Sequence, residues 1–391
     1  MPMKILYISD VYFPRVNGVS TSIRTFRREL AELGHQIDLV APRYGDEPDE
    51  EGIFRLPGFK VPFDPEDRLL HRRALKAHED EAARRAYDLI HVQTPFVAHR
   101  LGLRLARRLD IPVVETYHTF FEEYLYHYVP LAPRSLMRAL ARRFSRLQCN
   151  RVDQLVVPSR AMEDTLHGYG VTTPMERLPT GLVPDEFAAG NGAAFRDKYR
   201  IRHDRPTLLH VGRVAFEKNI SFLLRVLKRV AARIPDVLMV IAGEGPALGG
   251  LQRQAMDLDL MDHLLFIGNM DRAGELMDCY RAADAFVFAS RTETQGLVLL
   301  EAMALSVPVV STAVMGTKDI LEPGKGCLVA AEDETDFSSK VLQVLADAGL
   351  RTRLRREARD YALGQWSAAT MAGRMSRLYE DLARRRAARA A

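Results

Sequence analysis

Short apolar runs of strand length alternate with longer amphipathic stretches from one end of the chain to the other. This alternation is typical of parallel β-sheets whose strands are buried on both faces and covered by helices. The same order occurs twice, and 391 residues exceed the size of one ordinary core. The sequence therefore predicts the α/β class with two Rossmann-like domains. The expected strands cover residues 4–10, 36–42, 89–94, 113–118 and 154–159 in the first half, and residues 207–213, 237–243, 264–269, 285–290 and 308–313 in the second.

Domain boundaries follow from a run of small residues between the two halves. Residues 188–194 consist of Ala, Gly and Asn, so we expect a linker near residues 186–195. This gives a first domain over residues 1–187 and a second over residues 195–366. The final helical stretch, residues 368–391, is expected to complete the first domain.

Charge, hydropathy and cysteine content exclude several classes of protein. A net charge of +4 is too small to indicate nucleic-acid binding, because most Arg and Lys are matched by Asp and Glu. No window approaches the roughly 18 uninterrupted apolar residues of a membrane span, and the first residues resemble a buried strand more than a signal peptide, so a cytoplasmic protein is expected. Cys149, Cys279 and Cys327 are far apart and odd in number, which disfavours a disulfide framework or a zinc site and predicts packing residues.

Ligands of open α/β sheets bind beyond the carboxyl ends of the strands, so the loops after the predicted strands are the candidate sites. Gly18 stands where a helix begins after the first strand. A glycine there lets a phosphate approach the backbone N–H groups, although a turn glycine is the plainer interpretation. In the second half, Arg213 and Lys218 place two cations five residues apart in one loop. They can stabilise the charge of a leaving diphosphate, or they can be solvated surface charges.

The segment SRTETQGLVLLEAMA in the second half combines a glycine at a helix start with two carboxylates. The predicted helix begins near Gln295, so the N–H groups of Gln295, Gly296 and Leu297 would be available to phosphate oxygens. Glu293 in the loop can accept hydrogen bonds from sugar hydroxyls, and Glu301 in the helix can accept them from a ribose. A helix-capping acid and a surface acid are the alternative.

Several motifs in matching order resemble the retaining family 4 glycosyltransferases of GT-B fold, and the likeness spans nearly the whole chain. The resemblance implies two Rossmann-like domains that face each other across a cleft, with the acceptor on the first and the nucleotide sugar on the second. It implies no cofactor beyond the nucleotide diphosphate sugar, which is the substrate, and no metal. The acidic triplet at residues 257–259 is discounted as a metal site because it lies in or at the end of a predicted helix. The motifs are ISDVYFPRVNGVS at residues 8–20, VGRxxxxKN at 211–219, AGEGP at 242–246, FIG at 266–268, and ExxxxxxxE with GxxxxEAMA at 293–304.

The resemblance also implies roles for individual residues. Arg213 and Lys218 are expected to bind the donor diphosphate. Glu301 is expected to bind the ribose, and Glu293 to contact the donor sugar. The implied catalytic residues are His118, Arg213, Lys218 and Glu293; the implied donor-binding residues are Gly18, Arg213, Lys218, Gly243, Ile267, Gln295, Gly296, Leu297 and Glu301.

Two further roles come from the same resemblance in the first half. Gly18 is expected to lie against the phosphates and His118 beside the reacting sugar, although a lone histidine at a strand end is more often structural. The segment HTFFEEYLYHYVPLAP, residues 118–133, resembles the branch that glucosylates diacylglycerol and related lipids. It implies transfer of glucose, as from UDP-glucose, to a lipid acceptor. The alternatives are hexosyl transfer in polysaccharide or lipopolysaccharide assembly, including from GDP-mannose, and a noncatalytic nucleotide-sugar-binding protein.

Arginines and large apolar residues separate onto two sides of a predicted helix within residues 133–150. A cationic amphipathic helix can dock reversibly on an anionic membrane surface, which predicts a peripheral protein on the inner face of the cytoplasmic membrane. The alternative is an ordinary surface helix whose apolar side packs into the core. The arginines are Arg134, Arg138, Arg142 and Arg146, and the apolar residues are Leu136, Leu140, Phe144 and Leu147.

Overall fold

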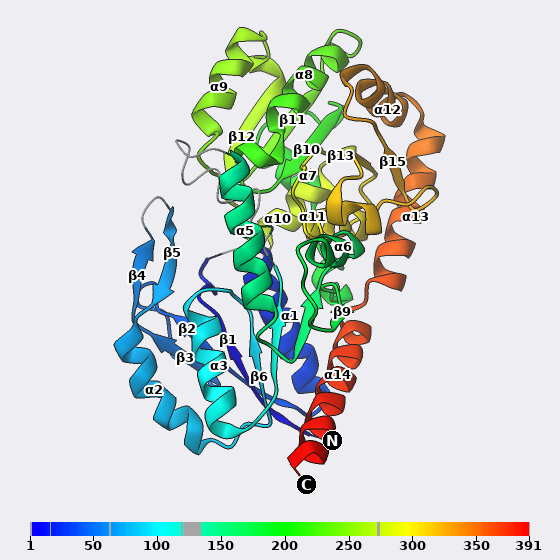
Figure 1. The fold of residues 1–391 in the computed structure, drawn as a ribbon. Helices are drawn as coiled ribbons and strands as arrows, with labels where there is room; N and C mark the ends of the chain where they lie inside the picture. Colours follow the sequence, from blue (N-terminus) through cyan, green and yellow to red (C-terminus); the bar gives the residue numbers. More distant parts are fainter. Residues whose placement is uncertain are drawn as a thin grey trace. The chain divides into compact units, whose positions relative to one another are not determined.

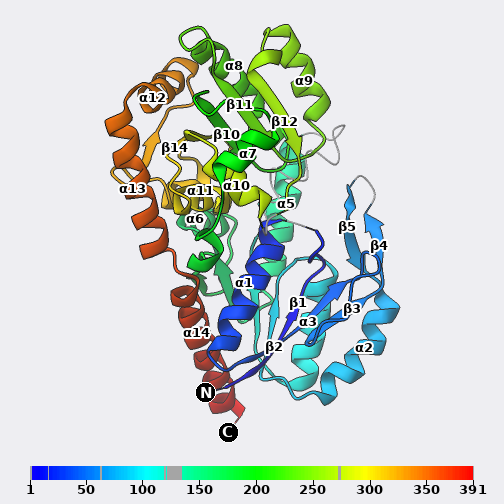
Figure 2. The ribbon, with the colours of Figure 1, turned by 180° about the vertical axis from the view of Figure 1, so that it is seen from behind.

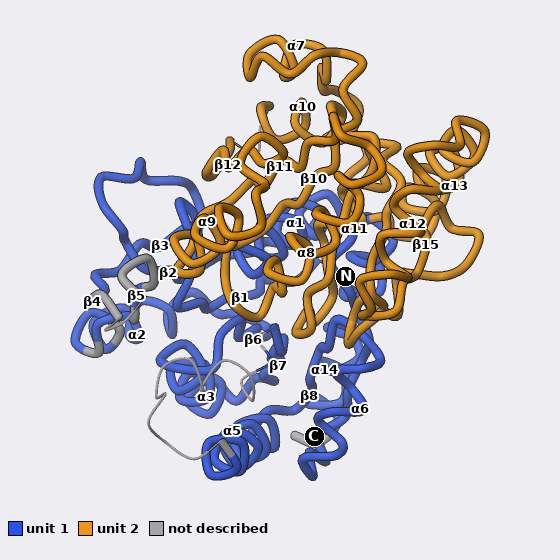
Figure 3. The backbone as a smooth tube through the Cα atoms, turned by 90° about the horizontal axis from the view of Figure 1, so that it is seen from above, with its two compact units in different colours: residues 1–181, 368–391 blue, residues 182–367 orange. Residues whose placement is uncertain are grey.

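The computed structural model describes residues 2–15, 17–61, 64–118, 120, 134–271 and 274–390. The chain divides into two compact units, shown in two colours in Figure 3. Unit 1 comprises residues 1–181 and 368–391, and unit 2 comprises residues 182–367. Residues 182–187, which the sequence placed in the first domain, therefore group with unit 2.

Unit 1 is built on a seven-stranded parallel sheet with helices along it (Figure 1). Its strand order, β3-β2-β1-β6-β7-β8-β9, changes direction between β1 and β6. The five strands expected from sequence are confirmed as β1, β2, β6, β7 and β8, and the central ones are buried on both faces. The elements are β1 Lys4–Ile8, α1 Gly18–Glu32, β2 Gln36–Pro42, β3 Ile53–Leu56, β4 Gly58–Val61, β5 Asp64–Leu70, α2 Arg72–Arg84, β6 Leu89–Val92, α3 Val97–Leu109, β7 Val113–Thr116, α5 Arg134–Cys149, β8 Gln154–Val157, α6 Arg160–Gly168, β9 Met175–Arg177 and α14 Ala368–Ala390.

The C-terminal helix α14 packs on unit 1 although it follows unit 2 in the chain (Figure 2). Met371 and Met375 enter the same apolar core as the strands β1 and β2. The buried hydroxyl of Tyr379 lies 2.8 Å from that of Tyr7 and 2.5 Å from Nδ1 of His91. These polar contacts fix the helix in one position, because each buried group would otherwise lack a hydrogen-bond partner.

Unit 2 contains a six-stranded parallel sheet in the order β12-β11-β10-β13-β14-β15. Successive residues of its strands enter two different cores: Leu209 and Phe286 face one layer of helices, and Leu208 and Val287 face the other. The five expected strands are confirmed as β10 to β14. The elements are η1 Pro184–Phe187, α7 Gly192–Lys198, β10 Thr207–Val211, η2 Phe216–Lys218, α8 Ile220–Ala231, β11 Leu238–Ala242, α9 Leu248–Asp257, η3 Met261–His263, β12 Leu264–Gly268, α10 Glu275–Arg281, β13 Ala285–Phe288, α11 Leu297–Ala304, β14 Val309–Ser311, η4 Met315–Asp319, β15 Cys327–Val329, α12 Glu334–Ala346 and α13 Ala348–Gln365.

The small residues of the expected linker belong to unit 2 and are tightly packed there. A Cβ at Gly192 would lie 2.5 Å from the backbone carbonyl of Arg281, so glycine is needed there for close approach. Arg196, in the following helix α7, donates hydrogen bonds to the carbonyl oxygens of Arg205 and Ala282. Composition alone cannot distinguish a flexible linker from a tightly packed one.

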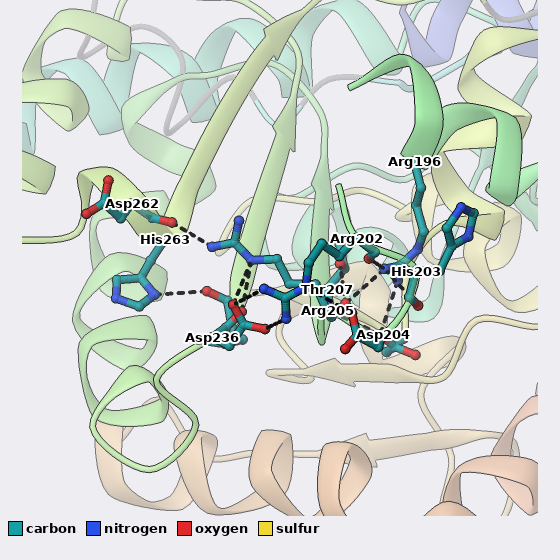
Figure 4. A network of polar contacts seen from close by, with 11 residues as sticks. Arg196, Arg202, His203, Asp204, Arg205, Thr207, Asp236, Asp262 and His263 are labelled. Carbon is teal, nitrogen blue, oxygen red and sulfur yellow. Dashed lines mark hydrogen bonds and ion pairs between the residues drawn. The ribbon is translucent and has the colours of Figure 1, made fainter. Parts of the chain in front are cut away.

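Figure 4 shows how the loop before β10 is fixed at the amino edge of this sheet. Arg205 donates to the carbonyl oxygens of Asp236, in the loop before β11, and of Asp262, in η3 before β12, at distances of 2.9 and 2.6 Å. Arg202 forms an ion pair with the carboxylate of Asp236. The arginines at the amino edge thus hold the loops of this edge together. The predicted donor-site residues of unit 2 lie around the opposite, carboxyl edge of the sheet.

Candidate functional site

Two loops at the carboxyl edge of unit 2 bring Lys218 and Glu293 together. Lys218 ends η2 after β10, and Glu293 follows β13; these two strands are adjacent in the sheet. The ammonium of Lys218 forms an ion pair with Oε1 of Glu293, and both side chains are mostly buried. Arg213 lies in the same loop as Lys218, two residues beyond β10. The predicted cations and the predicted sugar-binding acid therefore share one edge of the sheet.

The protein holds Glu293 in its ionised form. Burial by itself raises the pKa of this carboxyl, but the charge of the Lys218 ammonium and its hydrogen bond to the carboxylate outweigh burial, so the pKa of Glu293 lies below the usual range. The charges of Glu293 and Lys218 consequently neutralise each other in this ion pair. An anionic ligand near Lys218 would compete directly with Glu293 for the ammonium.

His210 is a buried neutral histidine of β10, near enough to Lys218 and Glu293 to be influenced by both charges. Its Nδ1 lies 3.3 Å from the carbonyl oxygen of Val287, and its ring stacks on Phe288 at 5.5 Å. Its Nε2 has no hydrogen-bond partner among the described residues. Burial, reinforced by the charge of Lys218, lowers its pKa to about 4. Sequence reasoning passed over this residue because a histidine inside a strand carries no signal of its own.

The pKa of His210 predicts a specific pH dependence of stability. The ordinary pKa of histidine is about 6.5, so below that pH His210 takes up a proton in the unfolded chain but stays neutral in the folded chain. The free energy of unfolding therefore decreases as the pH drops from 6.5 toward 4. Between pH 7 and 5.5 wild type should lose about 1 kcal/mol more than His210→Gln. Urea unfolding followed by the fluorescence of Trp366, the single tryptophan and a residue of unit 2, measures this. Parallel pH profiles for the two proteins would contradict it.

The helix predicted to begin near Gln295 begins two residues later. Gly296 has φ 98° and serves as the N-cap, so the helical hydrogen bonds of α11 start at Leu297. An L-residue is strained at this φ, which explains the glycine. Gly316, which sequence reasoning missed, donates its N–H to the carbonyl oxygen of Glu293 at 2.9 Å. A Cβ on Gly316 would collide with the carbonyl of Thr294, so this glycine lets the two loops meet.

Glu301 lies on α11 and is only 1% exposed. Its Oε2 accepts a hydrogen bond of 3.0 Å from the hydroxyl of Tyr280, so it is neither a surface acid nor a helix cap. Gln295 is also buried, whereas Leu297 and Ile267 are half-buried against the core of unit 2. The structure thus places these predicted donor-binding residues along the carboxyl half of the unit 2 sheet, and their roles stay predictions.

Gly243 is required by contact between two loops of unit 2. Its φ is 139°, and a Cβ there would overlap the carbonyl oxygen of Gly212 in the loop after β10. Its N–H donates to the carbonyl oxygen of Gly268 at 2.7 Å. These contacts account for the glycine without a ligand, and they fix the loop that carries Arg213.

The predicted residues of unit 1 lie at the carboxyl edge of its own sheet. His118 follows β7, and its Nε2 lies 3.1 Å from Oε1 of Gln93, which follows β6. Burial lowers the pKa of His118 to about 4, so the imidazole is neutral near pH 7. Gly18 is the first residue of α1, and a Cβ there would meet no atom within 4 Å, so packing within the protein does not require glycine.

Helix α5 exposes large apolar residues and buries several small or polar ones. Oγ of Ser145 lies 2.8 Å from the hydroxyl of Tyr117, and Gln148 donates to Glu115, so the helix is tied to β7 and the residue after it by polar contacts. The alternative that the apolar residues pack into the core is therefore wrong. We call the exposed set the apolar stripe; it comprises Leu136, Leu140, Phe144 and Leu147, between 38 and 52% exposed.

The predicted arginines lie on the same helix. Arg138, Arg142 and Arg146 have exposed side chains, and the guanidinium of Arg142 lies 5.6 Å from the ring of Tyr169. The side chain of Arg134 and the predicted lipid-branch segment, apart from His118 and residue 120, lie outside the described residues. Helix α5 therefore offers exposed positive charge and exposed apolar area together.

Within the described ranges, no three His, Cys, Asp or Glu side chains gather in a way that could hold a metal ion. None of the helices described combines the length and apolarity needed to cross a membrane.

Both halves of the chain match family models. Residues 16–186 match Glycosyltransferase Family 4, and residues 192–361 match Glycosyl transferases group 1. The chain is 36% identical over 324 residues to an alpha-monoglucosyldiacylglycerol synthase of Streptococcus pneumoniae, covering 79% of this chain and 71% of that protein. It is 29% identical to a GDP-mannose-dependent alpha-(1-6)-phosphatidylinositol monomannoside mannosyltransferase of Mycolicibacterium smegmatis, covering 99% and 100% of the two chains.

Solved structures show the same fold at lower identity. The sucrose-phosphate synthase of Thermosynechococcus elongatus superposes with a TM-score of 0.80 at 22% identity, covering 97% of this chain and 99% of that one. Anabaena HepE in complex with UDP and glucose gives a TM-score of 0.78 at 15% identity, covering 97% and 100%. From the family models, the identity to the relatives and the two parallel-sheet units, the chain belongs to the family 4 glycosyltransferases of GT-B fold.

Proposed function

We propose that this protein is a retaining, metal-independent glycosyltransferase that moves glucose from a nucleoside diphosphate sugar to diacylglycerol or a related lipid at an anionic membrane surface. The glycosyl transfer itself follows from the family. The sugar and the lipid acceptor are supported by the 36% identity to a synthase named for monoglucosyldiacylglycerol. The inner face of the cytoplasmic membrane is the proposed location.

The carboxyl edge of unit 2 is the proposed donor site. There Lys218 would exchange Glu293 for the diphosphate, with Arg213 on the same loop, and Glu293 would then be available to the sugar hydroxyls. The bond from the anomeric carbon to the phosphate oxygen breaks as the bond to the acceptor oxygen forms on the same face. The acceptor proton passes to the departing diphosphate oxygen, so the diphosphate serves as both leaving group and base.

Neutral His118 has a separate role in this proposal. Its Nε2 is directed at Gln93, which orients the ring at the end of β7. An uncharged imidazole can form a hydrogen bond with a sugar hydroxyl without repelling the positive charge that develops on the sugar ring. The lowered pKa keeps the ring in this form across the physiological range.

The apolar stripe of α5 is the main observation in favour of a lipid acceptor. A water-soluble acceptor would give no reason to expose four large apolar residues on a helix whose buried side already contains Met137, Ala141 and Cys149 beside Ser145 and Gln148. Exposed arginines on the same helix add attraction to anionic lipids, at about 1 kcal/mol each near the surface. Together they favour a bilayer as the place where the acceptor is met.

The proposal is tested by incubating the purified protein with EDTA and a panel of nucleotide sugars, with and without diacylglycerol in anionic vesicles. Release of nucleoside diphosphate from one donor only with lipid, and an α-anomeric product by NMR, is the expected result. Lipid-independent hydrolysis would redirect the search toward a polysaccharide or lipopolysaccharide acceptor. Loss of activity in EDTA would refute metal independence, and no release from any donor would favour a binding protein.

A further inference from the structure

A carboxylate outside the predicted site joins the two loops that carry Lys218 and Glu293. Glu332 lies after β15, two strands away from β13 in the sheet. Its Oε2 accepts a hydrogen bond of 2.9 Å from Nε of Arg291, and its Oε1 pairs with Nη2 of the same guanidinium. Its Oε1 also accepts a hydrogen bond of 3.1 Å from the side-chain amide of Asn219.

Each partner of Glu332 is a close chain neighbour of a donor-site residue. Asn219 directly follows Lys218, and Arg291 stands two residues before Glu293. Glu332 thus adds a side-chain link between the β10 and β13 loops, beside the Lys218–Glu293 ion pair itself. The ion pair must open when Lys218 turns to an anionic ligand, whereas the Glu332 contacts do not involve Lys218 or Glu293 and can persist.

The backbone conformation of Asn219 makes its contact with Glu332 important for the position of Lys218. Asn219 has φ 56° and ψ 32°, a left-handed conformation in which it ends η2 and caps α8. The turn that aims Lys218 therefore depends on one residue in an uncommon conformation. The Arg291 guanidinium lowers the pKa of Glu332, so the carboxylate stays charged near neutral pH.

We infer that Glu332 is a positioning residue of the donor site, which holds Asn219 and Arg291 so that Lys218 and Glu293 keep their places as the diphosphate binds. The inference rests on the proposed function and deepens it, because it names a residue that touches no reacting atom. A bidentate Arg–carboxylate contact is geometrically specific even when partly exposed, which suits such a role.

Glu334 supplies a matched control two residues further along the chain. Its side chain is 31% exposed, as is that of Glu332, and it also pairs with arginines, Arg225 and Arg229 of α8. Glu334→Ala therefore removes a similar surface ion pair in the same segment without disturbing Asn219 or Arg291. A general loss of surface charge would affect both variants alike.

The experiment measures binding of nucleoside diphosphates by calorimetry, and donor KM and kcat for hydrolysis or transfer. Glu332→Ala should raise the Kd for the diphosphate and the donor KM by about tenfold with a smaller change in kcat, and Glu332→Gln should recover part of the loss. Arg291→Ala should show the same defect, and the double variant no more than either one. Glu334→Ala should bind like wild type.

The outcomes separate the two hypotheses. If wild type binds no nucleoside diphosphate of the panel, the proposed function fails and the role of Glu332 fails with it. If wild type binds but Glu332→Ala binds equally well, only the positioning role is overturned. Equal losses for Glu332→Ala and Glu334→Ala, or additive losses for Glu332→Ala and Arg291→Ala, would also overturn it, because either would show a general effect.

Discussion

Replacing Lys218 by methionine is expected to lower donor turnover by about a hundredfold, because the side chain keeps its length but loses the charge that would stabilise the departing diphosphate. The structure makes the residue well suited to this task. It is mostly buried, so its charge is weakly screened, and it forms an ion pair with the carboxylate of Glu293. The measurement is release of nucleoside diphosphate at saturating donor, and wild-type turnover in Lys218→Met would contradict the assignment.

Two companion variants separate catalysis from folding. Lys218→Met leaves the ionised carboxyl of Glu293 without its partner, which by itself destabilises unit 2. Thermal unfolding of Lys218→Met and of Lys218→Met with Glu293→Gln shows how much stability the unpaired charge costs. Lys228→Met removes an exposed lysine from α8, the helix that follows Lys218 in the chain, and should keep full turnover.

The alternation of buried strands and helices was sufficient to predict the fold. Strands such as β11 and β13 are recognisable because burial on both faces leaves no polar residue to interrupt them. The edge strands β3, β9 and β15 and the hairpin β4–β5 were not expected, since they are short or carry charged residues, as in DPEDRLL of β5. Their pairing depends on neighbouring strands that a local pattern cannot reveal.

The site was predictable only as a set of loops. Parallel topology brings the residues after β10 and β13 to one edge, and the motifs pointed to Arg213, Lys218 and Glu293 there. The contact between Lys218 and Glu293 joins positions 75 residues apart, so the residues around either position do not predict it. The same holds for Gly316, whose absent side chain matters only because Thr294 lies against it.

The periodicity of α5 was ambiguous for a physical reason. An amphipathic pattern shows that apolar and charged residues lie on different sides of a helix, but it does not show which side packs against the protein. Here the buried side combines Met137, Ala141 and Cys149 with the polar Ser145 and Gln148, which no hydrophobic pattern would select. The exposed position of the apolar stripe is therefore known from the structure and not from the sequence. It identifies a surface that can be tested by mutation.

Introducing charge into that stripe should abolish membrane docking. The double variant Leu140→Glu with Phe144→Glu replaces two exposed apolar residues by anions, which removes apolar area from the bilayer contact and repels acidic lipids. Binding to anionic vesicles, measured by co-sedimentation, should fall at least about tenfold, since each large apolar side chain buried contributes about 1.5–3 kcal/mol. Transfer to diacylglycerol in vesicles should fall with it, whereas binding of the nucleoside diphosphate should not change.

The matched control for this variant is Leu33→Glu. Leu33 ends α1 elsewhere in unit 1 and is 49% exposed, the same fraction as Leu140, so it tests the effect of any new surface glutamate. Raising the salt concentration should weaken wild-type binding without eliminating it, because salt screens the arginines but not the apolar contact. Vesicle binding by the double variant equal to that of wild type would show that α5 faces something other than lipid, and equal losses in Leu33→Glu would show that net charge alone governs docking.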